Sequence, residues 1–146
     1  MAELSTEQIF NGTPAQVFEA IRQYSKYKEY IPGVTSTEVL PAQKKGSTCQ
    51  VRYDLKFIKT FYYTLDMYEE PGKKIYWHLA DSNLLKISNG SWDFTKVSDT
   101  ETRAVYAVEV AFSGFVPNKV VEQITKANLP AMMTGFQKLI DDFHNK

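Results

Sequence analysis

Two histidines and one cysteine are the residues of this chain that most often catalyse reactions or bind metals. His78 lies between Trp77 and Leu79 in an alternating stretch, on the side opposite to the apolar residues, and His144 lies near the C-terminal end. Neither stands in a His-x-x-x-His or His-x-Glu spacing, so no metal site is predicted. Cys49 has no histidine near it in the sequence, which favours a small buried apolar side chain over a nucleophile. We therefore expect His78 and Cys49 to be dispensable for function.

Carboxylate pairs are the second group that could do chemistry. Glu69-Glu70 precedes a Pro-Gly turn, and Asp141-Asp142 lies close to the C-terminus. Both pairs are typical of solvated positions, so we expect no acid–base site built on paired carboxylates. The sequence also has no Gly-rich phosphate loop and no Gly-x-Ser-x-Gly motif. It therefore predicts no catalytic residue, no metal and no cofactor.

Aromatic side chains are the third group, with nine Tyr, nine Phe and two Trp, or 14% of the chain. Many of them stand on the apolar side of alternating stretches, where they fill a core or line an apolar cavity. A tyrosine in such a place needs a partner for its hydroxyl, which a ligand or a trapped water could supply. Two adjacent methionines in the last helix would suit an adjustable wall, because methionine adapts to varied shapes. The candidate cavity residues are Tyr53, Tyr63, Leu65, Trp77, Trp92, Phe94, Tyr106, Val108, Met132, Met133 and Phe136.

Length and charge limit the class of protein. The 146 residues fit one domain, residues 1–146, long enough to bury a full core. Lys+Arg and Asp+Glu both total 17, and the two halves are each balanced, so we expect no nucleic-acid partner. Apolar runs are only a few residues long, which predicts no stable membrane insertion. The first residues do not resemble a signal peptide and a single cysteine excludes a disulfide framework, so we expect a cytoplasmic protein.

The elements that must position these side chains follow from apolar spacing. Residues 3–10 predict an edge strand. Thr13-Pro14-Ala15-Gln16 has the N-cap, the first-turn proline and the capping box of a helix start. A second short helix is predicted over residues 26–31, capped by Ser25 and ended by Pro32-Gly33.

Residues 34–112 alternate between apolar and polar types, most clearly over Cys49–Phe57. This pattern predicts about six strands joined by short turns, which must form an antiparallel meander. The apolar parity changes between Leu85 and Trp92. We therefore expect a β-bulge at Asn89-Gly90.

The remaining chain predicts one long helix over residues 118–143 with a single apolar face. Pro130 lies inside it and should kink it around residues 127–129. No other element is long enough to cover the apolar face of the sheet. The sequence thus predicts an α+β fold, a curved antiparallel sheet of about six to seven strands wrapped around a long C-terminal helix.

Several short segments, taken in order, resemble the START-like superfamily, whose architecture is also called the helix-grip or polyketide-cyclase/lipid-transport fold. The segments are Gly12-Thr13-Pro14-Ala15-Gln16-Val17-Phe18, Tyr24-Ser25-Lys26-Tyr27, Ile31-Pro32-Gly33-Val34, Asn89-Gly90-Ser91-Trp92-Asp93-Phe94, and Pro117 opening the last helix. Within the superfamily, the chain is most similar to the coenzyme-Q-binding and polyketide-cyclase/dehydrase branch. The resemblance implies a cavity between sheet and helix that holds a hydrophobic or amphipathic small molecule. Members include lipid carriers, quinone-binding proteins, aromatase/cyclases, plant hormone receptors and a ribosome-associated toxin, so the fold does not fix the function.

We therefore expect binding or transport of a hydrophobic small molecule, such as a lipid, an isoprenoid quinone or a polyketide-like compound. The cavity should measure a few hundred Å³ and be bordered by Tyr63, Trp77, Trp92 and Phe136. One alternative is an enzyme of the cyclase/dehydrase type, which would need an inward acid or histidine. Another is a ribosome-associated regulatory module, which would need a basic or aromatic outer patch.

Three tyrosines bear on that last alternative. Tyr62, Tyr68 and Tyr76 have the outward parity of their strands. An exposed aromatic cluster of this kind would mark a surface for a protein partner or for a homodimer. Exposure at the edge of the sheet would explain the three tyrosines equally well.

Overall fold

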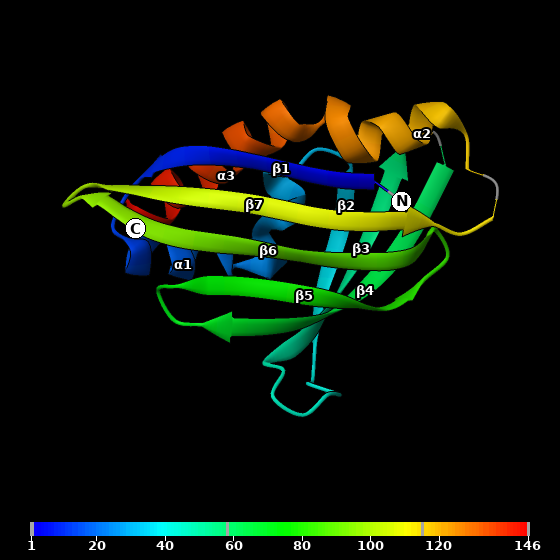
Figure 1. The fold of residues 1–146 in the computed structure, drawn as a ribbon, viewed down its shortest axis with the longest axis horizontal. Helices are drawn as coiled ribbons and strands as arrows, with labels where there is room; N and C mark the ends of the chain where they lie inside the picture. Colours follow the sequence, from blue (N-terminus) through cyan, green and yellow to red (C-terminus); the bar gives the residue numbers. More distant parts are fainter. Residues whose placement is uncertain (1, 58, 115, 146) are drawn as a thin grey trace.

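Seven antiparallel strands form one sheet in the order β1-β7-β6-β5-β4-β3-β2 (Figure 1). The computed structural model describes residues 2–57, 59–114 and 116–145. From β2 to β7, strands that follow one another in the chain are neighbours in the sheet, as short turns require. This sheet and the C-terminal helix confirm the predicted α+β architecture. The strands are β1 (Ala2–Asn11), β2 (Val34–Leu40), β3 (Cys49–Phe57), β4 (Lys59–Glu70), β5 (Lys74–Ser82), β6 (Leu85–Ser98) and β7 (Glu101–Phe112).

The N-terminal strand β1 closes one side of the sheet. It pairs with β7 from Ala2 opposite Val110 to Asn11 opposite Glu101. β1 and β2 are therefore the two edge strands. The edge strand predicted over residues 3–10 is confirmed at slightly greater length.

The first helix, α1 (Pro14–Ile21), begins with the predicted capping box. The Gln16 backbone N–H donates to the Thr13 hydroxyl over 3.2 Å, and the Thr13 backbone N–H donates to the Gln16 side chain over 2.9 Å. Two otherwise unpaired N–H groups are thus satisfied where the helix starts.

The second helix is a 3-10 helix, η1 (Tyr24–Glu29), whose N-cap is Gln23 without a side-chain hydrogen bond. The prediction of a helix over residues 26–31 capped by Ser25 is wrong in both start and type. The reason is burial: Tyr24 and Tyr27 both face the core. Residues three apart eclipse each other in a helix of three residues per turn, so this winding buries both rings together.

The C-terminal helix is interrupted. α2 (Asn118–Glu122) passes into a π-helical turn, η2 (Gln123–Ala127), and α3 (Leu129–His144) follows. Pro130 lies in the first turn of α3, where its missing N–H would have no intrahelical partner. The interruption predicted around residues 127–129 is confirmed. The π-helical turn before it was not predicted.

The bulge in β6 is displaced from its predicted position. The register of β6 against β7 shifts between Leu85 and Ile87 and again between Lys96 and Ser98, whereas Gly90 pairs regularly with its neighbours on β5 and β7. The bulge predicted at Asn89-Gly90 is therefore wrong. Gly90 instead permits a close approach, because a Cβ there would lie 2.3 Å from the Trp77 ring.

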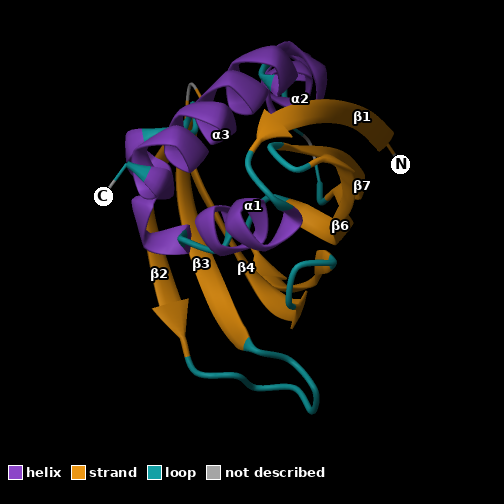
Figure 2. Cartoon of the chain, turned by 90° about the vertical axis from the view of Figure 1, so that its left-hand side faces the viewer, coloured by secondary structure: helices purple, strands orange, loops and turns teal. Residues whose placement is uncertain are grey.

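The sheet curls around α1, and α2 and α3 run across its open side (Figure 2). The apolar side chains of the strands point into the space between the sheet and the helices. There they form a continuous core with residues of α1, η1 and α3. Ile9, Val39 and Val97 are the large apolar residues that remain exposed among those described. The inner face of the sheet is therefore the surface on which a site for an apolar molecule can be built.

Candidate ligand cavity

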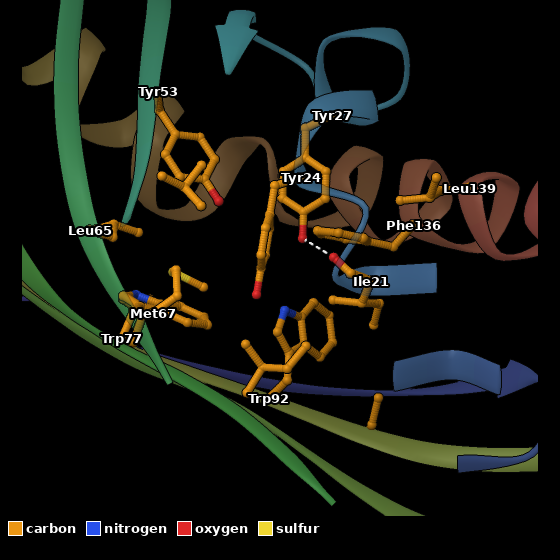
Figure 3. Close-up of a cluster of buried hydrophobic side chains, with 14 of the residues drawn as sticks. Ile21, Tyr24, Tyr27, Tyr53, Leu65, Met67, Trp77, Trp92, Phe136 and Leu139 are labelled. Atoms are coloured by element: carbon orange, nitrogen blue, oxygen red, sulfur yellow. Dashed lines mark hydrogen bonds between the residues drawn. The ribbon is translucent and has the colours of Figure 1, made fainter. Parts of the chain in front are cut away.

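A cavity of about 140 Å³ lies between the inner face of the sheet and the C-terminal helix. Its walls come from β1, η1, strands β3 to β7, η2 and α3. Figure 3 shows the part of the wall that η1, β3 to β6 and α3 contribute. The volume is smaller than the few hundred Å³ expected from the sequence. Aromatic rings occupy much of the space that the curved sheet leaves.

Nine of the eleven residues predicted for the cavity line it, and we retain these nine as proposed ligand contacts. Phe94 and Met133 do not line it. Phe94 lies farther along β6, where α1 covers the sheet, and its ring packs against Phe18 at 6.4 Å between centroids. Met133 borders a separate surface groove between β1 and α3, since one step along a helix turns a side chain by about 100° from Met132. The nine are Tyr53, Tyr63, Leu65, Trp77, Trp92, Tyr106, Val108, Met132 and Phe136.

The rings of the wall pack against one another at short range. Tyr53 and Tyr63 lie 4.9 Å apart between ring centroids, and Trp92 lies 5.0 Å from Tyr106 and 5.1 Å from Phe136. These offset and edge-on pairs lie in the range that stabilises aromatic contacts. The wall is therefore held together by contacts among its own rings.

Three tyrosine hydroxyls in this wall, those of Tyr53, Tyr63 and Tyr106, make no hydrogen bond within the part of the chain that the structure describes. Burial raises the pKa of Tyr106 to about 12 and also raises the pKa of Tyr53 and Tyr63, so all three stay protonated at neutral pH. Each can donate to, or accept from, a bound molecule or a water.

Two further tyrosines of the wall were not predicted. Tyr24 and Tyr27 both come from η1. The Tyr27 hydroxyl donates to the carbonyl oxygen of Ile21 (Figure 3), and the Tyr24 hydroxyl donates to the carboxylate of Glu69 over 2.7 Å. Because the two tyrosines are three residues apart, a prediction of a 3-10 helix for this segment would have placed both side chains on the face towards the cavity.

Glu69 is buried rather than solvated, with its side chain 6% exposed. Its carboxylate accepts a hydrogen bond from Arg22 Nε over 3.1 Å in addition to that from Tyr24. The prediction that Glu69-Glu70 is a solvated pair is therefore wrong for Glu69 and holds for the exposed Glu70. Neighbouring strand residues point to opposite faces, and Glu69 shares the inward parity of Met67. That parity is the signal that was missed.

The polar side chains singled out first in the sequence lie away from the cavity. His78 is exposed on the outer face, with Nδ1 2.8 Å from Asn89 Oδ1. Cys49 is half-buried, and burial raises the pKa of its thiol, which disfavours the reactive thiolate. Asp142 is exposed and accepts a hydrogen bond from the Tyr30 hydroxyl over 2.7 Å. That His78 and Cys49 are dispensable stays a prediction.

The three tyrosines of outward parity lie on the outer face of the sheet. Tyr68 and Tyr76 stack with ring centroids 4.8 Å apart and planes within 8°. Tyr62 lies under the guanidinium of Arg52, 4.4 Å from its ring centroid. A protein partner or a homodimer on this face stays a prediction.

Neither a metal centre nor a membrane span is found in the described ranges. No group of three His, Cys, Asp or Glu side chains gathers there as metal ligands. None of the helices described is long and apolar enough to cross a membrane.

Residues 11–137 match the family model described as polyketide cyclase / dehydrase and lipid transport. The chain belongs to this family. Membership agrees with the START-like resemblance seen in the sequence, and it does not single out the coenzyme-Q-binding branch, which stays a prediction. No curated protein matches the sequence of this polyketide cyclase/dehydrase and lipid transport family member.

Solved structures share its helix-grip fold over nearly the whole chain. A protein from Thermus thermophilus is 16% identical, with 97% of this chain and 98% of that one covered and a TM-score of 0.81. A START superfamily protein from Mycobacterium smegmatis is 12% identical, with 96% and 97% covered and a TM-score of 0.79. The Zhui aromatase/cyclase from a Streptomyces species is 12% identical, with 99% and 94% covered and a TM-score of 0.76. At these identities the likeness concerns the fold.

Proposed function

We propose that this protein binds a compact hydrophobic molecule in the cavity between its sheet and its C-terminal helix. The observation that carries the proposal is the wall itself: packed aromatic rings with three tyrosine hydroxyls that have no described protein partner. Such a site removes an apolar molecule from water and orients its polar group through a few hydroxyls. The family description, which includes lipid transport, supports the same class of ligand.

The volume of the cavity restricts the ligand. A cavity of about 150 Å³ lined by apolar residues holds a benzene-sized molecule, and this one measures about 140 Å³. A single ring, or a small fused ring system of the polyketide type, suits this space better than an isoprenoid tail or an acyl chain. A longer molecule would require α3 to lift from the sheet.

Extraction of the natural ligand tests the proposal. The protein is purified from its own host, and native mass spectrometry is followed by extraction into organic solvent. We expect a small aromatic or amphipathic compound at stoichiometric occupancy. Val108→Phe places a ring in the cavity and should remove at least nine-tenths of that compound, because Val108 lines the wall and is buried.

The matched control is Val105→Phe on the same strand. Val105 lies three residues before Val108, so its side chain has the opposite parity and points to the outer face of the sheet. It should retain the compound. Equal occupancy in both variants, or no compound in the parent protein and no binding of small aromatic probes, would contradict the proposal.

A second candidate function is favoured by the hydrogen bond between Tyr24 and Glu69. Tyr24 lines the cavity, and its hydroxyl can pass a proton to the buried Glu69 carboxylate while accepting one from a bound molecule. This is the inward acid that a cyclase/dehydrase-type enzyme needs. Conversion of a polyketide-like substrate that is abolished by Glu69→Gln, with binding retained, would identify the protein as an enzyme.

A further inference from the structure

The wall of the cavity contains one buried acceptor that the fold leaves unsatisfied. Gln123 lines the cavity, and its side-chain oxygen Oε1 is buried without a hydrogen-bond partner in the part of the chain described. Buried side-chain oxygens are paired in most native proteins, and an unpaired one is destabilising. A site that binds a ligand is one place where such an atom is retained.

Gln123 also opens the π-helical turn η2 (Gln123–Ala127). Turns of this type are rare and frequently lie at functional sites. Within the turn, the Thr125 hydroxyl donates to the Val121 carbonyl oxygen over 2.7 Å. The Gln123 side-chain oxygen makes no such bond to the described part of the helix, so its placement at the cavity is not explained by the helix itself.

The polar groups around the cavity are not equivalent. A tyrosine hydroxyl can donate or accept, so the hydroxyls of Tyr53, Tyr63 and Tyr106 tolerate either kind of ligand group. The Gln123 oxygen can only accept. With the amide oriented as in the structure, a ligand that presents an O–H or N–H at this end of the cavity satisfies Oε1, whereas an ether or a bare ring of the same shape leaves it unpaired.

We propose that Gln123 selects ligands that carry a hydrogen-bond donor, so that the cavity takes compact phenol-like or indole-like rings in preference to isosteric rings without a donor. This inference rests on the proposed function, since it assigns a chemical class to the same cavity. Under this proposal, Gln123 is a specificity-determining residue at the start of the π-helical turn η2.

Two ring systems of one shape test the inference by isothermal titration calorimetry. Indole carries an N–H donor, and benzofuran has an oxygen acceptor at the same position. We expect the parent protein to bind indole at least tenfold more tightly than benzofuran, a difference of about 1.4 kcal/mol. Gln123→Leu keeps the size of the side chain and removes the acceptor, and it should bring the two affinities within about threefold of each other.

The control is Gln43→Leu, the same chemical change at an exposed position in the loop between β2 and β3. It should keep the preference for indole. A measurement on the parent protein avoids dependence on the folding of the variant. At saturation with indole, the side-chain amide signals of Gln123 in a ¹⁵N-correlated NMR spectrum should shift further than at saturation with benzofuran, whose ring current alone acts on them.

The outcomes separate the two proposals. Binding of both compounds with equal affinity, or a preference that persists in Gln123→Leu, overturns the role of Gln123 and leaves the cavity as a binding site. Binding of neither compound overturns the proposed function for compact rings, and the present inference with it.

Discussion

Phe136 is the side chain at which the helical and strand walls of the cavity meet. Its ring lies edge-on to Tyr27 of η1 at 5.3 Å and to Trp92 of β6 at 5.1 Å. It is only 4% exposed. Through these two contacts, one residue of α3 packs against both the 3-10 helix η1 and the sheet.

Phe136→Ala should lower the free energy of unfolding by about 3–5 kcal/mol, because it removes a buried ring and leaves a void between three elements. Urea unfolding followed by tryptophan fluorescence measures the change. Val97→Ala is the control, since Val97 is 49% exposed and its truncation should change stability by less than about 0.5 kcal/mol. Similar losses in the two variants would show that Phe136 does not connect these walls.

Adjacent glutamates give a second comparison at the scale of the residue. Glu69→Ala should destabilise the protein by about 1–3 kcal/mol, because it leaves Tyr24 and Arg22 without their shared buried acceptor. Glu70→Ala should change stability by less than about 0.5 kcal/mol, since Glu70 is exposed. The same unfolding measurement compares them, and an equal effect of the two changes would be inconsistent with the burial of Glu69.

Strand parity made much of the cavity wall predictable. The inward parity of Tyr53, Tyr63 and Trp77 follows from period-two alternation, which tertiary contacts do not disturb. Gln123 had no such signal, because it lies where an α-helical turn passes into a π-helical one, so no single helical period describes its surroundings. Met133 was assigned to the wrong wall for a related reason. Unless the start of a helix is known, the sequence does not decide which of two adjacent residues, such as Met132 and Met133, faces the cavity.

At the scale of elements, the approach of α3 to η1 depends on a glycine. A Cβ at Gly135 would lie 2.2 Å from the carbonyl oxygen of Tyr30, which is backbone and cannot rotate away. The helix and the end of η1 therefore pack more closely than any other residue type would allow. This contact fixes how closely α3 approaches the end of η1.

Gly135→Ala should destabilise the protein by more than about 2 kcal/mol, although alanine favours a helix by about 1 kcal/mol over glycine. Thermal unfolding with circular dichroism measures the net effect. The neighbouring Thr134→Ala serves as the control, because Thr134 is exposed and alanine is the better helix former there. A stabilised Gly135→Ala variant would mean that the helix stands farther from η1 than described.

Local pattern explains which elements were predicted correctly and which were not. The capping box at Thr13 and the strand over Cys49–Phe57 are set by nearby residues, and the sequence alone was sufficient. The bulge near Leu85 depends on how β6 must bend to keep pairing with β7, so it reflects the curvature of the sheet rather than the residues at the bulge.

At the scale of the whole molecule, buried phenols make stability depend on alkaline pH. The pKa of Tyr106 is raised by burial to about 12, against about 10 in an unfolded chain. Between these values the unfolded chain releases a proton that the folded chain keeps, so the free energy of unfolding falls as the pH rises from about 10 towards 12. Below pH 10 this contribution is fully present.

Urea unfolding at pH 8, 10 and 11 should show this fall. Tyr106→Phe removes the titrating group and should make the slope above pH 10 shallower by up to about 1.4 kcal/mol per pH unit. Tyr53 and Tyr63, whose pKa values are also raised by burial, account for part of the slope that remains. An unchanged slope in Tyr106→Phe would place that hydroxyl in contact with bulk water.

The pairing of β1 with β7 has a consequence for how the chain is made. The first strand of this sheet in chain order pairs with its last, Ala2 opposite Val110, so β1 cannot find its place until nearly all of the sheet has left the ribosome. At about 5–20 residues per second, β1 waits as a nascent, unpaired segment for roughly 5–20 seconds. Glu3 and Glu7 stand exposed along it, and such charges discourage the pairing of a waiting strand with other chains. The strand that closes the sheet is thus also the strand that must stay soluble longest during synthesis.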